Sequence, residues 1–385
     1  MSMRIGIDAR FYGSLGKGLG RYTEKLIESL EEVDTTNEYV IFLRRENFDE
    51  YVPRSPQFHK VLADYHWYGL AEQILFPWLL LRQHLDLVHF PHFNVPVLYP
   101  KRFVVTIHDL ILLRYPTLRN TTRLAMWYWV KFAFYRLVIW TACFRARTVI
   151  TVSRFTESDL LQEFPFLLGK TWVTLEGADR NCAVALPQEQ GEVLKKCGLS
   201  LLETNGSSLH QRDILQPYFL YVGNAYPHKN LEMIGAIAAR FPEYRFVLVG
   251  RSDYFYQQLK RTFTSPNLCF AGFLSDTELS VLYRHAIAYV FPSFYEGFGL
   301  PPLEAMNYGL PVISSERGSL PEVLGKAALY FDPEQEASFE RQIRSVATDK
   351  ELSQRMRHRG YRHVRLFSWK RMAKSTQNVY REALS

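Results

Sequence analysis

Two glutamates with glycines between them occur in the last third of the chain. They lie in the stretch SFYEGFGLPPLEAM, residues 293–306, where Glu296 and Glu304 are eight positions apart. Carboxylates accept hydrogen bonds from vicinal hydroxyls, a feature that ribose and hexose rings share. Gly297 and Gly299 allow the backbone to bend closely around a ligand. We therefore interpret this stretch as part of a binding site for a sugar.

The same stretch predicts a helix N-terminus suited to phosphate. Pro301 and Pro302 fit the first turn of a helix, where a missing N–H group costs little. A helix N-terminus carries partial positive charge that attracts a pyrophosphate. We expect Glu304 in the first helical turn and Glu296 in the loop before it. Because two acids would repel a free phosphate ion, the combination favours a sugar nucleotide.

Histidine and lysine follow two other apolar strands. His108, in VVTIHDL, can donate a hydrogen bond to a ligand or transfer a proton, and a structural histidine beside a capping Asp109 is the alternative. Lys229, in YVGNAYPHKN, is a point charge that suits a diphosphate. The ordinary interpretation of Lys229 is a solvated surface lysine. Its position directly after a strand favours a role in binding.

A glycine-rich loop follows the first strand, in FYGSLGKGLGRYTEKL. Gly16, Gly18 and Gly20 permit close approach to a phosphate, although a simple turn explains them equally well. No acid follows the second strand, which ends in arginines, so a nicotinamide dinucleotide site is disfavoured.

A metal site has little support in the sequence. His89, His92 and His108 lack helical spacing and an evident carboxylate partner, and no D-x-D motif occurs. We therefore expect neither a metal nor a cofactor.

Composition and charge limit the class of protein. The 385 residues are 47% hydrophobic and 22% charged, which predicts two globular domains. A net charge of +7 suits anionic ligands or serves solubility alone, and no nucleic-acid-binding motif is present. The four cysteines form no C-x-x-C pair, and the N-terminus MRIGIDAR is already a strand, so a reduced, cytoplasmic protein without a signal peptide is expected.

An apolar segment, residues 123–147, raises the question of a membrane. Arg123, Lys131 and Arg136 interrupt it, so it is too short to span a bilayer. One interpretation is a mostly buried helix, and the other adds peripheral contact with the inner face of the plasma membrane. The second is favoured by nearby basic residues and by the aromatic residues Trp127, Tyr128, Trp129 and Trp140.

Strands alternate with helices in both halves of the chain, which predicts parallel sheets covered on both faces. A linker of turn residues separates the halves at about residues 178–216. The expected fold class is α/β, with two doubly wound Rossmann-like domains. In such sheets the ligand binds beyond the carboxyl ends of the strands, where each candidate motif lies.

The sequence resembles the family-4 retaining glycosyltransferases of the GT-B fold. The segments that carry the resemblance, in order, are GLGRYTEKL, TIHDL, TVSRFTESDL, YVGNAYPHKN, YEGFGLPPLEAMNYGLPVISS and FSW. The resemblance implies two Rossmann-like domains facing across a cleft, with the C-terminal helix crossing back to the first. The implied domains are 1–178 plus 368–385, on the acceptor side, and 179–367, which binds the nucleotide sugar.

The resemblance also implies roles for single residues. Glu296 corresponds to the carboxylate that holds the donor sugar, and Glu304 to the ribose-binding acid. Lys229 corresponds to the lysine that neutralises the diphosphate, and His108 to the histidine that contacts the sugar. The remaining implied donor-binding positions are Gly16, Gly18, Asn224, Gly297, Phe298, Gly299 and Leu300.

One position departs from the family pattern, because Asn224 stands where many members have arginine. His228, Arg251 and Arg21 are candidates for the missing cation. GDP-mannose is the favoured donor, since the motifs resemble mannosyltransferases of surface polysaccharide assembly, and UDP-sugars stay open. The implied acceptor is a glycan or lipid-linked oligosaccharide. The alternatives are another GT-B enzyme and a non-catalytic protein that binds glycans or nucleotides.

Overall fold

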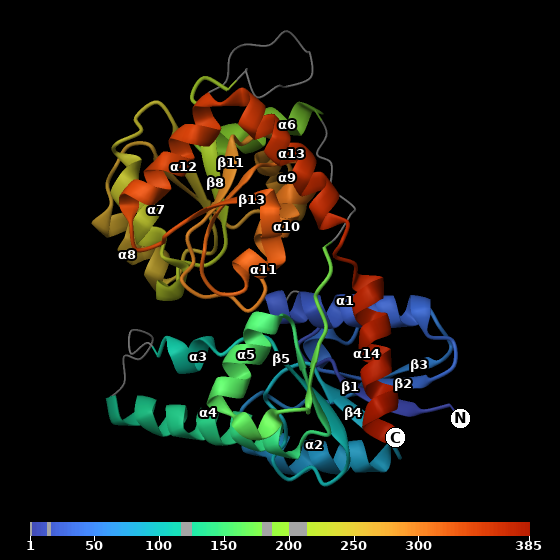
Figure 1. Ribbon diagram of the computed structural model, residues 1–385. Helices are drawn as coiled ribbons and strands as arrows, with labels where there is room; N and C mark the ends of the chain where they lie inside the picture. Colours follow the sequence, from blue (N-terminus) through green and yellow to red (C-terminus); the bar gives the residue numbers. More distant parts are fainter. Residues whose placement is uncertain (1, 14–16, 117–124, 179–186, 200–213) are drawn as a thin grey trace. The chain divides into compact units, whose positions relative to one another are not determined.

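The structure is a computed structural model of the 385-residue chain, and it describes residues 2–13, 17–116, 125–178, 187–199 and 214–385 (Figure 1). The chain forms two compact units. Unit 1 comprises Met1–Gly177 and Ser368–Ser385, and unit 2 comprises Ala178–Phe367. Gly16, Arg123 and most of the expected linker lie outside the described residues.

Unit 1 contains a parallel sheet of seven strands in the order β3-β2-β1-β4-β5-β6-β7. The strand order reverses between β1 and β4, which makes this the topological switch point of the sheet. The strands are β1 (Arg4–Asp8), β2 (Glu38–Leu43), β3 (Phe58–Leu62), β4 (Leu87–Phe90), β5 (Phe103–Ile107), β6 (Thr148–Thr151) and β7 (Thr171–Val173).

Helices cover both faces of this sheet (Figure 1). α1 packs against α14, and α14 contacts β4, β5 and β6. α2, α4 and α5 contribute to a core cluster with the other face. The helices are α1 (Lys17–Val33), α2 (Leu70–Arg82), α3 (Ile111–Arg114), α4 (Ala125–Arg145), α5 (Arg154–Glu163) and α14 (Trp369–Leu384). Ser153 caps α5 by accepting a hydrogen bond from the Thr156 amide.

Alternation along β4 shows how the two faces are filled. Val88 and Phe90 belong to the core shared with α2, α4 and α5. His89 lies between them in sequence, so it points to the opposite face, where its Nδ1 is 2.7 Å from the Tyr380 hydroxyl of α14. Its Nε2 is 2.8 Å from the Thr106 hydroxyl. Because burial also lowers the pKa of His89 to about 3, this residue is a neutral structural histidine.

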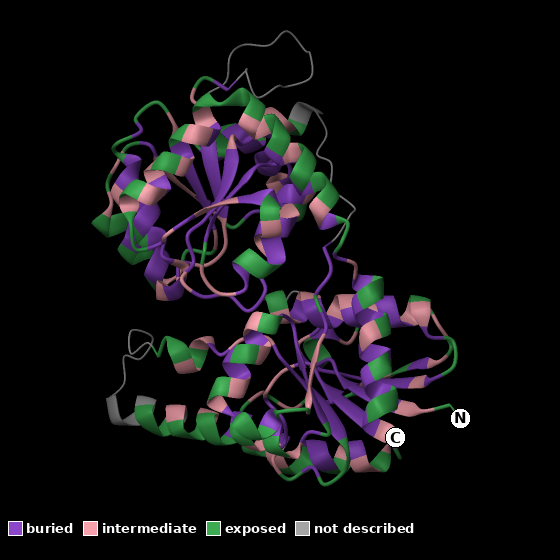
Figure 2. Ribbon diagram, viewed as in Figure 1, coloured by how far each residue is buried: buried purple, intermediate pink, exposed green. Residues whose placement is uncertain are grey.

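Unit 2 contains a parallel sheet of six strands in the order β10-β9-β8-β11-β12-β13, with its switch point between β8 and β11. Two Rossmann-like sheets therefore confirm the predicted fold class. Figure 2 shows their strands mostly buried. The strands are β8 (Tyr218–Val222), β9 (Arg245–Val249), β10 (Leu268–Gly272), β11 (Ala288–Phe291), β12 (Val312–Ser315) and β13 (Ala328–Phe331).

The helices of unit 2 flank its sheet, so that parallel strands can be joined by right-handed crossovers. They are α6 (Pro187–Lys196), α7 (Leu231–Ala238), α8 (Tyr254–Thr262), α9 (Asp276–His285), α10 (Leu300–Asn307), α11 (Leu320–Leu324), α12 (Glu336–Thr348) and α13 (Lys350–Val364). One short 3-10 helix, η6 (Pro227–Lys229), matters for the site because it follows β8 directly.

Helix α4 is less buried than the first interpretation of its sequence expects. Its buried residues lie near its C-terminal end, at Val138, Ile139, Ala142 and Cys143. Large apolar side chains are exposed along the rest of its described length. Figure 2 colours much of this part of α4 as exposed. No helix in the described ranges has the length and the apolar content that crossing a membrane requires.

Candidate active site

Lys229 and Glu296 form an ion pair at the switch point of unit 2. Lys229 ends η6 after β8, and Glu296 lies in the loop after β11, the two strands that flank the switch point. Lys229 Nζ is 2.6 Å from Glu296 Oε1, and the side chains are only 14% and 9% exposed. Ligands of doubly wound sheets bind at this place. The fold thus brings together a cation and a carboxylate 67 positions apart.

Backbone contacts hold the two loops in this position. The Phe294 amide donates to the His228 carbonyl at 2.7 Å, which ties the β11 loop to η6. Asn230 adopts the left-handed conformation at φ 54°, and its side-chain Nδ2 donates to the Pro292 carbonyl at 3.2 Å. The Ser319 amide donates to the Glu296 carbonyl at 3.2 Å. A Cβ at Gly318 would lie only 2.9 Å from the Glu296 amide nitrogen, so the approach of this loop needs glycine.

Glu304 lies further along α10 than the sequence interpretation expects. The helix begins at Leu300 because Gly299 adopts the left-handed conformation, at φ 98°, and ends the loop there. Glu304 is therefore the fifth helical residue, and the prediction that it occupies the first turn was wrong. The two prolines at the helix start have no N–H group. Among the first four helical residues, N–H donors exist only at Leu300 and Leu303.

The loop that leads into α10 is built around buried backbone. Phe298 is buried, and its ring lies edge-on to Phe367 at 5.8 Å, so its side chain packs in the core. Its carbonyl accepts a hydrogen bond from the Ser319 hydroxyl at 2.9 Å. A Cβ at Gly299 would meet Leu320 at 2.7 Å. Gly297, Phe298 and Gly299 can therefore offer a ligand main-chain atoms, which fits the role predicted for them.

Glu296 and Glu304 act on the same buried hydroxyl. Burial raises the pKa of Tyr289 well above its usual value, and the negative charges of Glu304 and Glu296 raise it further. The Tyr289 hydroxyl donates to the Val222 carbonyl at 3.0 Å, at the end of β8. The charges of both carboxylates therefore reach the Tyr289 hydroxyl at the end of β8.

Asn224 stands where the family pattern has a cation, and His228 and Arg251 are two of the candidates to replace it. The Asn224 side-chain oxygen accepts from the Tyr226 amide at 3.3 Å, a local turn contact. Burial and the charge of Lys229 lower the pKa of His228 to about 4, so the imidazole is neutral at neutral pH. Arg251 follows β9 and is exposed, with its guanidinium 5.4 Å from the Phe273 ring centroid.

In unit 1, His108 follows β5 and lies between two acceptors. Its Nε2 is 2.9 Å from the Pro91 carbonyl oxygen, and its Nδ1 is 3.2 Å from Glu176 Oε1. Burial alone lowers the pKa of His108, but the hydrogen bond and charge of Glu176 and the Pro91 carbonyl outweigh it and raise the pKa. A protonated ring donates at both nitrogens. Its contact with a donor sugar stays a prediction.

The raised pKa of His108 can be measured by an NMR titration of its ring protons. We expect the pKa of His108 to lie above its usual value in the native protein and to fall in Glu176→Gln, because that variant removes the negative charge that raises it. Because the folded pKa is the higher one, this pair stabilises the fold fully at low pH and less as the pH rises through that pKa. The difference in the free energy of unfolding between the two proteins, measured in urea, should therefore be larger at pH ~6 than at pH ~8.5. Identical titration curves would contradict this pairing.

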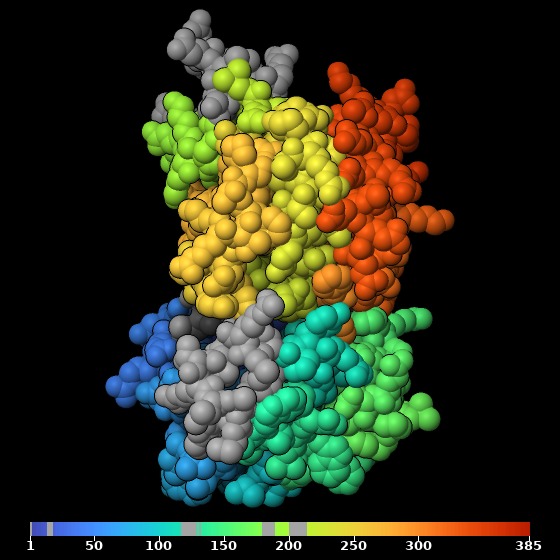
Figure 3. All heavy atoms as spheres, turned by 90° about the vertical axis from the view of Figure 1, so that its left-hand side faces the viewer, coloured from blue at the N-terminus to red at the C-terminus, as the bar shows by residue number. Residues whose placement is uncertain are grey.

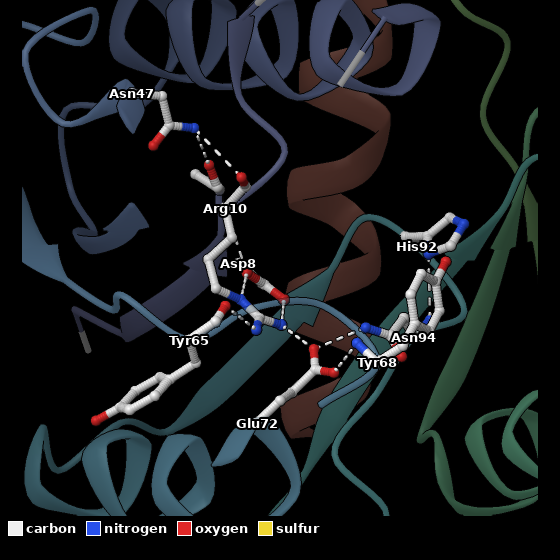
Figure 4. Close-up of polar contacts among 9 residues, drawn as sticks. Asp8, Arg10, Asn47, Tyr65, Tyr68, Glu72, His92 and Asn94 are labelled. Carbon is white, nitrogen blue, oxygen red and sulfur yellow. Dashed lines mark hydrogen bonds and ion pairs between the residues drawn. The ribbon is translucent and has the colours of Figure 1, made fainter. Parts of the chain in front are cut away.

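The switch point of unit 1 holds an ion cluster that the sequence interpretation missed (Figure 4). Arg10 is fully buried, and its Nη2 lies 2.8 Å from Asp8 Oδ2 and 2.6 Å from Glu72 Oε1. Asn94, after β4, donates to Glu72 at 2.7 Å. The sequence pattern that could have revealed this cluster is the pair of charged residues at the end of the first strand, in RIGIDAR. No sequence pattern pointed to Glu72, which comes from α2.

The remaining predictions concern the glycines after the first strand and a metal site. Gly16 lies outside the described residues, and Gly18 belongs to the first turn of α1 rather than to a loop. Gly20 is the glycine that packing requires, because a Cβ there would lie 2.1 Å from the Gly13 carbonyl oxygen. Within the described ranges, no three His, Cys, Asp or Glu side chains are grouped so that they could hold a metal.

Comparison with known families agrees with this geometry. The family described as "Glycosyltransferase Family 4" matches residues 16–180, and the family described as "Glycosyl transferases group 1" matches residues 210–363. With two Rossmann-like units and a site at a switch point, the chain belongs to the GT-B glycosyltransferases, and it is a hexosyltransferase.

Individual relatives narrow the comparison. The O-antigen chain mannosyltransferase B of Escherichia coli is 27% identical over 94% of this chain and 96% of its own length. The O-antigen chain mannosyltransferase RfbU of Salmonella typhimurium is 28% identical over 73% of this chain and 70% of its own. Among solved structures, the sucrose-phosphate synthase of Thermosynechococcus elongatus superposes with a TM-score of 0.76 at 19% identity, over 99% of this chain and 98% of its own. The chain thus resembles mannosyltransferases within its family.

Proposed function

We propose that the protein transfers mannose from GDP-mannose to a hydroxyl of a glycan or lipid-linked oligosaccharide, with retention of the α configuration. The observation that carries this proposal is the Lys229–Glu296 pair, at 2.6 Å, at the switch point of unit 2. The choice of mannose is supported by the similarity to O-antigen chain mannosyltransferases. The base of the nucleotide is proposed from the sequence resemblance alone.

The proposed chemistry needs a cation more than it needs a base. The bond between the anomeric carbon and the diphosphate breaks, and negative charge develops on the leaving oxygen. Lys229 stabilises this charge, together with main-chain N–H groups of residues 297–300. The acceptor oxygen bonds to the anomeric carbon on the same face, and its proton passes to the diphosphate. Mass-spectrometric detection of a glycosyl ester on the enzyme would overturn this single-step mechanism.

Glu304 has the proposed role of binding the ribose hydroxyls, so its removal should weaken donor binding. We expect Glu304→Ala to raise KM for the donor about 10- to 100-fold, the cost of hydrogen bonds to a charged group, with kcat changed much less. Initial rates at varied donor concentration measure both constants. Glu322→Ala, in α11, is a matched control that removes an exposed glutamate of unit 2. An unchanged donor KM in a folded Glu304→Ala protein would place the ribose elsewhere.

The proposed acceptor would place the protein at a membrane surface. A lipid-linked glycan lies at a membrane surface, and the exposed apolar residues of α4 suit contact with such a surface. We therefore include peripheral membrane contact in the proposal. It remains separate from the choice of donor, because α4 belongs to unit 1 and the Lys229–Glu296 pair to unit 2.

A panel of nucleotide sugars tests the proposed donor. Each is incubated with the protein, and slow hydrolysis to the nucleoside diphosphate is followed. GDP-mannose is expected to be hydrolysed faster than UDP-glucose, UDP-galactose and ADP-glucose. Faster hydrolysis of a UDP-sugar would replace the donor but keep the reaction. No hydrolysis, and no transfer to any glycan acceptor, would contradict the proposed function and favour a non-catalytic binding protein.

A further inference from the structure

A basic hollow of about 620 Å³ opens on unit 1, at the edge of the sheet where β5, β6 and β7 begin. Apart from a proline and an alanine, every residue that lines it is cationic, and none is acidic: Lys101, Arg102, Arg145, Arg147 and Lys170. These cations precede the first residues of the three strands. The hollow is therefore at the edge opposite to the carboxyl ends of β1 and β5, which carry the Arg10 cluster and His108.

Hydrogen bonds fix part of this basic hollow in place. Lys170 donates to the Cys143 and Phe144 carbonyls, at 3.0 and 2.7 Å, and so caps the C-terminal end of α4. Arg145 donates to the Val97 and Tyr99 carbonyls. Burial and the charge of nearby Arg147 lower the pKa of Lys170. Gathering like charges without a carboxylate among them is unfavourable, and a bound anion would relieve this repulsion.

An exposed aromatic patch adjoins the basic hollow. It consists of Trp140, Phe144 and Phe166, whose rings contact one another: Trp140 stacks on Phe144 with centroids 5.0 Å apart, and Phe166 lies 5.7 Å from Phe144. Phe144 is 55% exposed, and its carbonyl is one of the two to which Lys170 donates. In Figure 3 the teal and green spheres of α4 form part of the surface of unit 1. The apolar surface continues along α4 through Leu137 and Phe134.

We propose that the basic hollow binds the phosphate headgroup of an anionic lipid while the aromatic patch enters the bilayer interface. The cations select for negative charge, and exposed Trp and Phe side chains beside them are the side chains that partition into a headgroup region. A free phosphate ion would use the cations but leave the aromatic patch without a role. The inference rests on the membrane contact proposed above, and it adds the ligand chemistry and the groups that bind it.

Sedimentation with vesicles of phosphatidylcholine, alone or mixed with phosphatidylglycerol, tests this site. The native protein should bind the mixed vesicles, and the binding should weaken as salt is added. Lys101 and Arg147 are exposed, so Lys101→Ala with Arg147→Ala should fold. Each lost cation should lower the partition coefficient about fivefold, so the double variant loses about 25-fold. Lys101→Arg with Arg147→Lys keeps both charges and should bind like the native protein.

Two further variants test whether vesicle binding depends on this particular surface or only on the net charge of the protein. Lys260→Ala with Arg261→Ala removes the same charge from the exposed end of α8 in unit 2, and should leave binding unchanged. Phe144→Ser should lower binding about tenfold, because a half-exposed ring no longer enters the interface. Equal losses from the hollow and the α8 variants would overturn the proposal. So would full vesicle binding by the Lys101/Arg147 double alanine variant.

Inorganic phosphate and nucleotide-sugar hydrolysis complete the test. If calorimetry shows phosphate binding to the basic hollow while the native protein does not bind mixed vesicles, the site binds a soluble anion and the lipid proposal is wrong. Hydrolysis of the nucleotide sugar without vesicles should be equal in all these variants. A native protein that binds vesicles through the hollow but hydrolyses no nucleotide sugar would refute the proposed function and leave the lipid site standing. A native protein that hydrolyses the nucleotide sugar but binds no vesicles would refute the lipid site alone.

Discussion

Lys229→Ala is expected to lower kcat about 10²- to 10³-fold, the loss seen when one donor to a developing oxyanion is removed. Lys229 is only 14% exposed, so its charge acts in a medium that screens it less than water does. Steady-state transfer from the nucleotide sugar measures the effect. Lys229→Arg retains the positive charge and should lose much less activity.

The variant also removes the partner of Glu296, so stability has to be measured alongside activity. A nearly buried carboxylate without its cation costs free energy, and we expect a lower melting temperature as well. Lys260→Ala, at an exposed site of the same unit, serves as the control for loss of a lysine. A folded Lys229→Ala protein with native turnover would contradict the proposed role of Lys229.

Arg10→Met should destabilise the protein by about 3–5 kcal/mol, because it leaves Asp8 and Glu72 buried without their cation. It also removes the guanidinium that lies 4.1 Å from the Phe76 ring centroid. Burial raises the pKa of Glu72 even with Arg10 present. Urea unfolding at neutral pH measures the loss of stability.

Two comparisons make the Arg10 result specific. Adding Asp8→Asn and Glu72→Gln removes both charges, so the triple variant should be more stable than Arg10→Met alone. Without Arg10, burial should raise the folded pKa of Glu72 still further above its unfolded value. The loss should then be full at pH ~7 and shrink as the pH falls toward ~4.5. A loss that is the same at both pH values, or a triple variant no better than the single one, would show that charge burial is not the cause.

Much of the fold was accessible from the sequence because parallel strands buried on both faces leave a local pattern. RIGID has an apolar centre and FVVTI is a run of aromatic and β-branched residues, and these segments form β1 and β5. β3, with the sequence FHKVL, is an edge strand with polar exposed positions, and it was not predicted. An edge strand has one paired side, so it carries no such pattern.

The sequence by itself determined most of the segments that form strands and helices, which groups follow the strands, and to which family the chain belongs. All of these depend on residues that are neighbours in the chain. The tertiary structure alone decided that Lys229 meets Glu296, that Glu72 joins Arg10, and that Glu176 holds the proton on His108. It also decided that the aromatic patch is exposed. Charge, burial and pKa depend on distances in space, and those are set only when distant segments pack together.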